Sequence, residues 1–374
     1  MPCHSILPQD LIFEVLSRLP VKSLLRLKTV CRHWLDLISS SNFIATHLGQ
    51  SNCTSSLLLT FQGRYREATT YGISLLDDEL AMLKHQDLPF QAKKRGDIFS
   101  IVGCCNGLVC ISLEDDGADC VIWNPATRQY WHMPAPLIPV VPNHCFVRWG
   151  FGFHPETNEH KLLRIVQSFD QEKHVFPRRK YMLRTEIFTL STGLWREING
   201  IPPCICQDRS IAVAVKGVQH RIVNKGWSRS NGGFVLSFDM GTEQFSKIEV
   251  PPNCGHNKRQ KLLPFRQLLA MLVWTAGFQS IFDMWTMKND SWTKLFVVGP
   301  FPKPVFAIGV WRNCEILVCP AIKEEEDDMT LHNDRLLLFG TLTKVTREVP
   351  NSKVQSFHEG GTYAESLLSV YPGF

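Results

Sequence analysis

The segment LPQDLIFEVLSRLPVKSLLRLKTVCRHW, residues 7–34, is where the hydrophobic pattern of the chain is clearest. Leu11, Val15 and Leu19 are spaced four residues apart, which predicts one apolar stripe along a helix. Pro20 ends that helix, because a residue that precedes proline is driven out of the α region. The chain is therefore expected to begin with a short amphipathic helix.

Two further short helices are predicted downstream, one containing Leu24 and one containing Trp34 and Ile38. The serines at 39–41 end the third helix, and a short closing helix is expected at 42–48. A unit of roughly 40 residues rarely buries enough surface to be stable alone. Its leucine-rich face must therefore be covered by the rest of the chain or by another protein.

The same residues resemble a known domain. The strings Leu-Pro-x-Asp-Leu, Val-Leu-x-Arg-Leu-Pro-Val-Lys-Ser-Leu-Leu-Arg and Val-Cys-Arg-x-Trp are similar to the F-box of plant F-box proteins, here in residues 1–48. This resemblance implies a three-helix F-box that docks on a Skp-type adaptor and, through it, on the cullin and RING subunits of a ubiquitin ligase. The residues that would face the adaptor or shape these helices are Leu7, Pro8, Leu11, Leu16, Leu19, Pro20, Leu24, Leu25, Val30, Cys31 and Trp34. Taken alone, the apolar stripes favour a helical cap packed on the following domain, because such stripes usually face a core. The full run of motif residues reverses that preference.

Composition bounds the remaining possibilities. Apolar residues make up 44% of the 374 positions, which suits one small module and one large domain. A net charge of +5 is too mild to indicate nucleic acid as a partner. The thirteen cysteines form no Cys-x-x-Cys, the N-terminus lacks a secretory pattern, and no apolar run reaches membrane-spanning length. We therefore expect an intracellular protein of the cytoplasm or nucleus, without a membrane span.

From residue 57 onward, short β-branched and aromatic runs alternate with Gly, Pro, Asn and Asp. One pattern recurs, in which an aromatic residue is followed seven positions later by a second ring or a comparable side chain, with turn-forming residues between. The copies begin at Trp123, Phe153, Phe188, Phe238 and Trp285, and a degraded copy runs from Phe339 to Thr346. Each copy predicts a β-hairpin whose paired rings lie near one another across the two strands.

The copies recur at intervals of 30 to 54 residues, which favours small sheets repeated around an axis, as in a β-propeller. The irregular intervals leave a two-sheet sandwich as the alternative. The region also resembles the plant F-box-associated domain, whose family includes F-box/kelch and S-locus F-box proteins. The segments that carry this resemblance are 103–110, 123–128, 149–153, 158–162, 190–195, 236–240, 285–287, 291–294 and 363–367.

Two residues depart from the family pattern. Arg221 follows His220 where the family has an aromatic residue, and Gly340 stands where Asp is common. Both departures concern local strand detail. The fold class implied is thus α+β, with a three-helix F-box followed by an all-β, irregular propeller-like domain over residues 57–374.

The sequence contains no phosphate-binding loop and no nucleophile elbow. Cys204-Ile205-Cys206 and Cys254-Gly255-His256 have the wrong spacing for a zinc site. No catalytic residue, metal or cofactor is predicted. The charged runs at 93–95, 178–180 and 324–328 are interpreted as surface loops.

The two resemblances together imply the substrate-recognition subunit of a Skp–cullin–F-box ubiquitin ligase, which holds the adaptor at one end and a target protein at the other. Neither the target nor the residues that bind it are predicted. Two alternatives keep the F-box: a ligase-independent scaffold bound to the adaptor, and an S-locus F-box protein that recognises a ribonuclease in pollen. A third alternative, a glycan-processing propeller hydrolase, requires acids such as Asp239, Asp283 and Glu315 to converge in one cleft.

Overall fold

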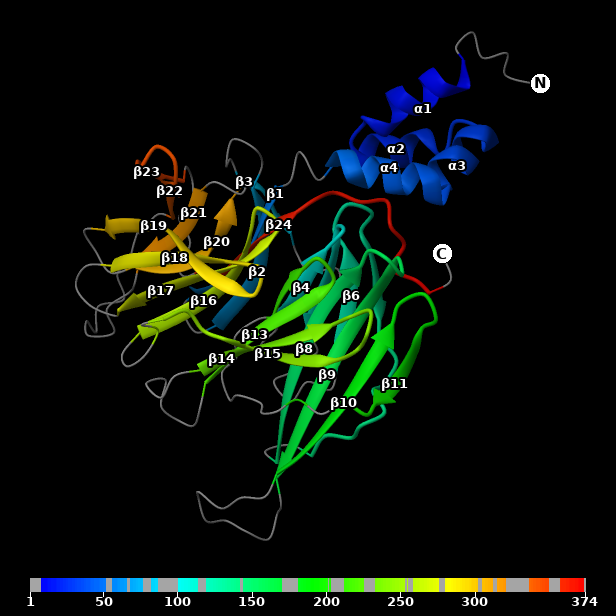
Figure 1. Cartoon of the computed structure of the whole chain (residues 1–374). Helices are drawn as coiled ribbons and strands as arrows, with labels where there is room; N and C mark the ends of the chain where they lie inside the picture. Colours follow the sequence, from blue (N-terminus) through cyan, green and yellow to red (C-terminus); the bar gives the residue numbers. More distant parts are fainter. Residues whose placement is uncertain are drawn as a thin grey trace.

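Helices come first in the chain and strands follow (Figure 1). The computed structural model describes residues 8–51, 56–65, 68–76, 82–86, 100–113, 119–141, 144–169, 181–200, 202, 212–224, 233–252, 254, 258–275, 280–301, 305–311, 315–320, 336–349 and 357–372. The predicted charged runs at 93–95, 178–180 and 324–328 lie outside these residues.

The helical module, residues 9–51, consists of α1 (Gln9–Ser17), α2 (Val21–Leu27), α3 (Arg32–Ser39) and α4 (Ser41–Ser51). The closing helix predicted at 42–48 lies within α4. Pro8 and Pro20 occupy the N-cap positions of α1 and α2, with φ of −54° and −58°. A proline at a helix start loses no hydrogen bond, because the first N–H groups have no partner within the helix.

The strands of the described residues form six four-stranded antiparallel sheets. The first three sheets are β24 (Phe357–Tyr363), β1 (Ser56–Tyr65), β2 (Ala68–Leu76) and β3 (Met82–Gln86); β4 (Ser100–Cys105), β5 (Leu108–Ser112), β6 (Cys120–Asn124) and β7 (Gln129–His132); and β8 (Cys145–His154), β9 (Glu159–Phe169), β10 (Tyr181–Thr189) and β11 (Leu194–Ile198). The last three sheets are β12 (Val213–Val215), β13 (Val218–Asn224), β14 (Gly233–Asp239) and β15 (Phe245–Glu249); β16 (Lys258–Phe265), β17 (Leu268–Thr275), β18 (Ser280–Lys288) and β19 (Ser291–Phe301); and β20 (Val305–Trp311), β21 (Glu315–Pro320), β22 (Leu337–Gly340) and β23 (Thr346–Glu348).

The sheets are arranged in a closed ring. The innermost strands lie side by side in the order β24, β4, β8, β12, β16 and β20, and β20 lies beside β24 again. The ring is closed where β24 pairs antiparallel with β1, from Ser56 opposite Tyr363 to Phe61 opposite Phe357. Such radial repetition defines a β-propeller. The propeller prediction is confirmed, and the two-sheet sandwich is wrong.

The predicted hairpins account for most of the tight turns. Five copies of the repeat place their two key residues directly opposite each other: Trp123 and Tyr130, Phe153 and His160, Phe188 and Trp195, Phe238 and Phe245, and Phe339 and Thr346. The copy at Trp285 differs, because β18 and β19 are joined by only two residues, Asn289 and Asp290. Trp285 therefore lies opposite Lys294 and not opposite Trp292.

The hydrophobic core is divided into layers between neighbouring sheets. Ile122 and Leu162 belong to the layer between the second and third sheets, and Phe282 and Val318 belong to the layer between the last two. Such layers hold the ring together, because each sheet buries both faces against its neighbours. Arg221 fits this arrangement despite its departure from the family pattern: it lies in β13 opposite Leu236, and its guanidinium donates to the backbone carbonyl of Trp149.

Candidate functional site

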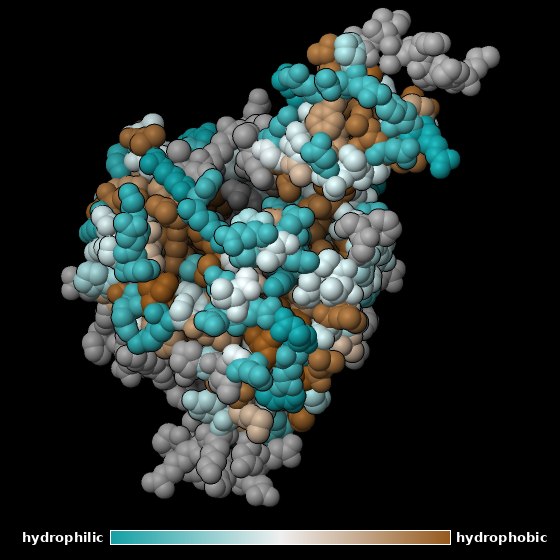
Figure 2. All heavy atoms as spheres, turned by 45° about the vertical axis from the view of Figure 1, so that its right-hand side comes forward, coloured by the Kyte–Doolittle hydropathy of each residue, from teal (hydrophilic) through white to brown (hydrophobic). Residues whose placement is uncertain are grey.

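The helical module has a small core of its own and an apolar surface beside it. Leu16, Val21, Leu24, Ile38 and Phe43 are buried in that core. Apolar side chains on the outside are Leu11, Val15, Val30 and Leu35, with exposed fractions of 47%, 59%, 62% and 43%. Figure 2 shows apolar side chains at the surface of the helical module in the upper right of the view. These four exposed aliphatic residues are the candidates for an interaction surface on the module.

The residues singled out from the sequence fall into three environments. Leu16 and Leu24 are buried and shape the helices. The exposed members of the set are Pro8, Leu11, Pro20 and Val30, and the half-buried members are Leu19, Leu25, Cys31 and Trp34. Leu7 lies outside the described residues.

Two exposed residues were missing from the predicted set. Val15 follows Leu11 by one turn on α1, and Leu35 lies on α3. Their spacing was visible in the sequence, but an apolar stripe alone does not distinguish a side chain that faces the core from one that faces outward. Leu11 and Val15 are exposed and stay outside the core, whereas Leu16 on the same helix is only 3% exposed and belongs to it.

A different set of helical residues contacts the propeller. Leu367, from the segment after β24, and Ala126, from the turn between β6 and β7, pack against the core of the helical module. The Glu365 carboxylate accepts a hydrogen bond of 3.3 Å from the backbone N–H of Val21, at the start of α2. The propeller thus covers part of the helical module while the four exposed residues Leu11, Val15, Val30 and Leu35 stay open to solvent.

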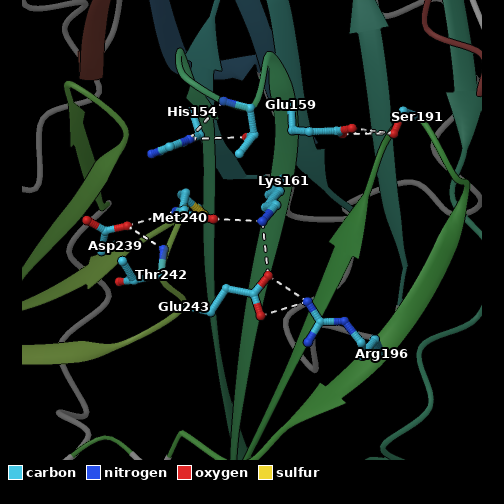
Figure 3. Close-up of polar contacts among 11 residues, drawn as sticks. His154, Glu159, Lys161, Ser191, Arg196, Asp239, Met240, Thr242 and Glu243 are labelled. Carbon is cyan, nitrogen blue, oxygen red and sulfur yellow. Dashed lines mark hydrogen bonds and ion pairs between the residues drawn. The ribbon is translucent and has the colours of Figure 1, made fainter.

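A polar network joins the third and fourth sheets (Figure 3). The Lys161 ammonium donates to the Met240 carbonyl at 2.7 Å and to the Glu243 carboxylate at 3.0 Å. The Arg196 guanidinium contacts both Glu243 oxygens, at 2.5 and 2.6 Å. Burial by itself would raise the pKa of Glu243, but hydrogen bonds from Arg196 and Lys161 outweigh it and lower that pKa below its ordinary value.

The polar groups around this network have hydrogen-bond partners of their own. Asp239 accepts hydrogen bonds of 2.8 Å from the N–H groups of Gly241 and Thr242, and Ser191 donates to Glu159 at 2.8 Å. Figure 3 shows these pairs beside Lys161 and Glu243. The network therefore fastens two sheets to each other, which is a structural task.

The acids that a hydrolase would need do not converge. Asp239, Asp283 and Glu315 lie in three different sheets. Asp283 pairs with Lys294 at 2.8 Å, and Glu315 accepts two hydrogen bonds from Arg347, at 2.9 and 3.0 Å. These three residues do not assemble the acid pair that glycoside hydrolysis requires.

A small cavity lies between the third and fourth sheets. Its volume is about 20 Å³, and Trp149, Gln219 and Phe238 are among its lining residues. The indole N–H of Trp149 and both amide atoms of Gln219 are buried without a hydrogen-bond partner among the described residues. A space of this size is too small for a substrate.

The described residues contain neither a cluster of metal ligands nor a helix that could span a membrane. Within that part of the chain, no three His, Cys, Asp or Glu side chains are grouped to hold a metal ion. Cys254 is described, but Cys204, Cys206, Gly255 and His256 are not. No described helix has the length and apolar character that a membrane crossing requires.

Two family models match this arrangement of helices and sheets. The F-box domain matches residues 4–46, and the F-box associated beta propeller domain matches residues 56–335. The chain belongs to the F-box-associated β-propeller family. The helical module is its F-box, and the ring of sheets is its F-box-associated domain.

Relatives from Arabidopsis thaliana that are named as F-box proteins match most of this chain. An F-box/kelch-repeat protein is 27% identical over 309 residues, covering 78% of this chain and 79% of that protein. The F-box protein CPR1 is 25% identical over 326 residues, covering 82% of this chain and 76% of that protein. Among solved structures, the β-propeller domain of the Trilobed protease from Pyrococcus furiosus matches with a TM-score of 0.34 and 10% identity, over 78% of this chain and 71% of that chain. That likeness is too distant to support an argument.

Proposed function

We propose that this protein is the substrate-recognition subunit of a Skp–cullin–F-box ubiquitin ligase. The observation that carries the proposal is the exposed apolar set Leu11, Val15, Val30 and Leu35, on an F-box that its own propeller leaves partly uncovered. The proposed partners are a Skp-type adaptor and, through it, the cullin and RING subunits. The proposed location is the cytoplasm or nucleus, where these subunits act.

In this proposal the adaptor covers the exposed aliphatic residues. Fully burying one Leu or Val side chain contributes roughly 1.5–3 kcal/mol, so four half-exposed side chains contribute several kcal/mol together. The buried residues Leu16 and Leu24 contribute indirectly, because they hold α1 and α2 in place. The predicted adaptor-binding residues thus divide into those that touch the adaptor and those that position them.

The propeller holds the target protein, and the chain performs no bond chemistry itself. Binding both proteins raises the effective concentration of a target lysine near the ubiquitin-loaded enzyme. The gain depends on geometry, since effective concentration falls when the two binding sites move freely relative to each other. A firm joint between F-box and propeller is therefore part of the proposed mechanism.

The substitution Leu11→Asp tests the adaptor site. Leu11 is 47% exposed, so the free protein should tolerate the charge, whereas the covered interface should not. We expect the dissociation constant for a purified Skp-type adaptor, measured by calorimetry, to rise by roughly 100-fold. Leu24→Asp is unsuitable as a probe, because Leu24 is 0% exposed and its replacement would disrupt the F-box core.

Leu342→Asp provides a matched control, since Leu342 is 75% exposed on the turn between β22 and β23. This variant should bind the adaptor like the wild type. Wild-type adaptor affinity in Leu11→Asp would contradict the proposal. Adaptor binding without recruitment of a cullin would instead favour a ligase-independent scaffold.

A further inference from the structure

The segment that follows the last strand, residues 364–372, contributes to two separate hydrophobic cores. Leu367 packs in the core of the F-box, and Val370, three residues later, packs in the core between the second and third sheets. The two side chains are 6% and 0% exposed. Figure 1 shows this red segment running between the helices and the upper edge of the propeller. A single stretch of backbone is thus shared by both domains.

On the F-box side, the segment contacts the start of α2. The Glu365 carboxylate accepts the N–H of Val21, one of the first-turn donors that a helix cannot satisfy internally. Val21 is 0% exposed and belongs to the same core as Leu367. The segment therefore contacts the F-box twice: Glu365 binds the N-terminus of α2, and Leu367 packs in the F-box core.

On the propeller side, the segment is held by the turn between β6 and β7. The Asn124 amide nitrogen donates to the carbonyls of Ser366 and Leu368, at 3.0 and 2.8 Å. The Tyr363 hydroxyl accepts the N–H of Ala126 at 3.1 Å. Gly107, with φ of +77°, lies so close to Ala364 and Ser366 that an added Cβ would overlap them.

The turn between β14 and β15 shows what Asn124 adds. The side-chain oxygen of Asn124, Oδ1, caps its own turn by accepting the N–H groups of Ala126 and Thr127, at 3.0 and 3.3 Å. Asp239 caps the corresponding turn of the fourth sheet in the same way. An aspartate therefore suffices for the turn, and the amide nitrogen of Asn124 serves the C-terminal segment alone.

We propose that residues 364–372 form a clamp that fixes the orientation of the F-box on the propeller, with Asn124 and Glu365 as its positioning residues. Only the purpose of the clamp rests on the proposed function: it holds the target at a constant place relative to the ubiquitin-loaded enzyme. The contacts that form the clamp lie within this one chain, so the clamp and the ligase role can be tested separately.

Asn124→Asp removes the clamp while keeping the turn. A carboxylate still accepts the two turn N–H groups, but it cannot donate to Ser366 and Leu368 and faces two carbonyl oxygens. In the full chain, we expect the amides of residues 364–372 to exchange with deuterium at least about tenfold faster. Small-angle scattering should show a larger radius of gyration, because the F-box is released from one orientation.

Asp239→Asn is the matched control. It changes the same chemical group in the equivalent turn, where the carboxylate accepts the N–H groups of Gly241 and Thr242 as Asn124 accepts those of its own turn, so exchange of 364–372 and scattering should stay at wild-type values. Adaptor affinity should be unchanged in both variants, because the exposed residues of the F-box are not part of the clamp. Leu11→Asp therefore tests the adaptor site and Asn124→Asp tests the clamp, and either proposal can fail without the other.

Asn124 is 0% exposed, so a second variant keeps the test decisive if Asn124→Asp fails to fold. Glu365→Ala removes an exposed carboxylate and the acceptor for Val21, and should speed exchange of the Val21 amide several-fold. Glu156→Ala, in the exposed turn between β8 and β9, is its control. Wild-type exchange and scattering in a folded Asn124→Asp protein, or wild-type Val21 exchange in Glu365→Ala, would overturn the clamp.

Discussion

Two histidines are enclosed in the propeller. His160 on β9 contacts the rings of Phe151 and Phe153, and its Nε2 accepts a hydrogen bond of 3.4 Å from the side-chain amide nitrogen of Asn106. His220 on β13 contacts the Ser237 hydroxyl at 2.8 Å. Burial lowers the pKa of each ring from its ordinary 6.5 to about 4. Both rings are therefore neutral in the folded protein at physiological pH.

These pKa values predict a loss of stability in mild acid. Between pH 6.5 and about 4 the unfolded chain protonates both rings while the folded protein does not, so the unfolded state binds more protons. The free energy of unfolding therefore falls as the pH is lowered through this window, by at most roughly 1.4 kcal/mol per pH unit for each ring. Urea unfolding of His160→Gln and His220→Gln should show a weaker pH dependence. An unchanged slope in both variants would contradict this account.

The connection between β7 and β8 is held by a buried ion pair. Glu186 on β10 and Arg164 on β9 are 0% and 1% exposed, and they pair directly. The Glu186 carboxylate also accepts the N–H groups of Leu137 and Ile138, at 2.8 and 3.1 Å, and both of these residues lie in the connection between β7 and β8. Next to it, the indole of Trp195 on β11 donates to the carbonyl of Pro134 at 2.8 Å. Side chains of the third sheet therefore anchor the chain that leads into it from the second.

Glu186→Ala should destabilise the propeller strongly. It leaves the Arg164 charge buried without its partner and frees two backbone N–H groups, which costs roughly 3–5 kcal/mol. Thermal or urea unfolding measures this change. Glu197→Ala is the control on the same hairpin, because Glu197 pairs with Arg184 at 2.6 and 2.7 Å in an exposed position. Its unfolding midpoint should stay near that of the wild type. Equal effects of the two substitutions would be inconsistent with the buried pair.

The sequence predicts a contact more readily when the two contacting residues are close together along the chain. Hairpins such as Phe188 with Trp195 were predictable, because partner and turn lie within one short string. The exception at Trp285 arises from a shorter turn, which the seven-residue spacing concealed. The pairing of Ser56 with Tyr363 and the hold of Asn124 on Ser366 join distant parts of the chain, and no local pattern encodes them. Exposure of Leu11 likewise depends on what the rest of the fold leaves uncovered.

At the scale of the whole molecule, the F-box depends on the propeller for part of its core. Leu367 and Ala126 both come from beyond the helices, yet they pack with Leu16 and Leu24. The F-box is thus completed from one side by its own chain and, in the proposed function, from the other side by the adaptor. Neither contact alone encloses all of its apolar side chains.

Residues 1–51 produced alone should therefore be poorly folded. Without Leu367 and Ala126 the core is open, and so short a chain buries too little surface to offset the loss. We expect weak helical circular dichroism without a cooperative melting transition, and recovery of both when a purified Skp-type adaptor is added. The full chain, which contains the complete core, is the control. Cooperative melting of the isolated F-box at the temperature of the full chain would refute this expectation.

The closure of the ring by β24 also has a consequence for synthesis. The ribosome releases β1 long before its neighbour β24, which begins at residue 357, 292 residues after β1 ends at residue 65. At roughly 5–20 residues per second, the inner edge of β1 waits for about 15 to 60 seconds with its backbone groups unpaired, a state that invites misassembly. A message that stops before residue 357 yields a protein with an open ring and an untethered F-box together, so a single truncation disrupts both domains.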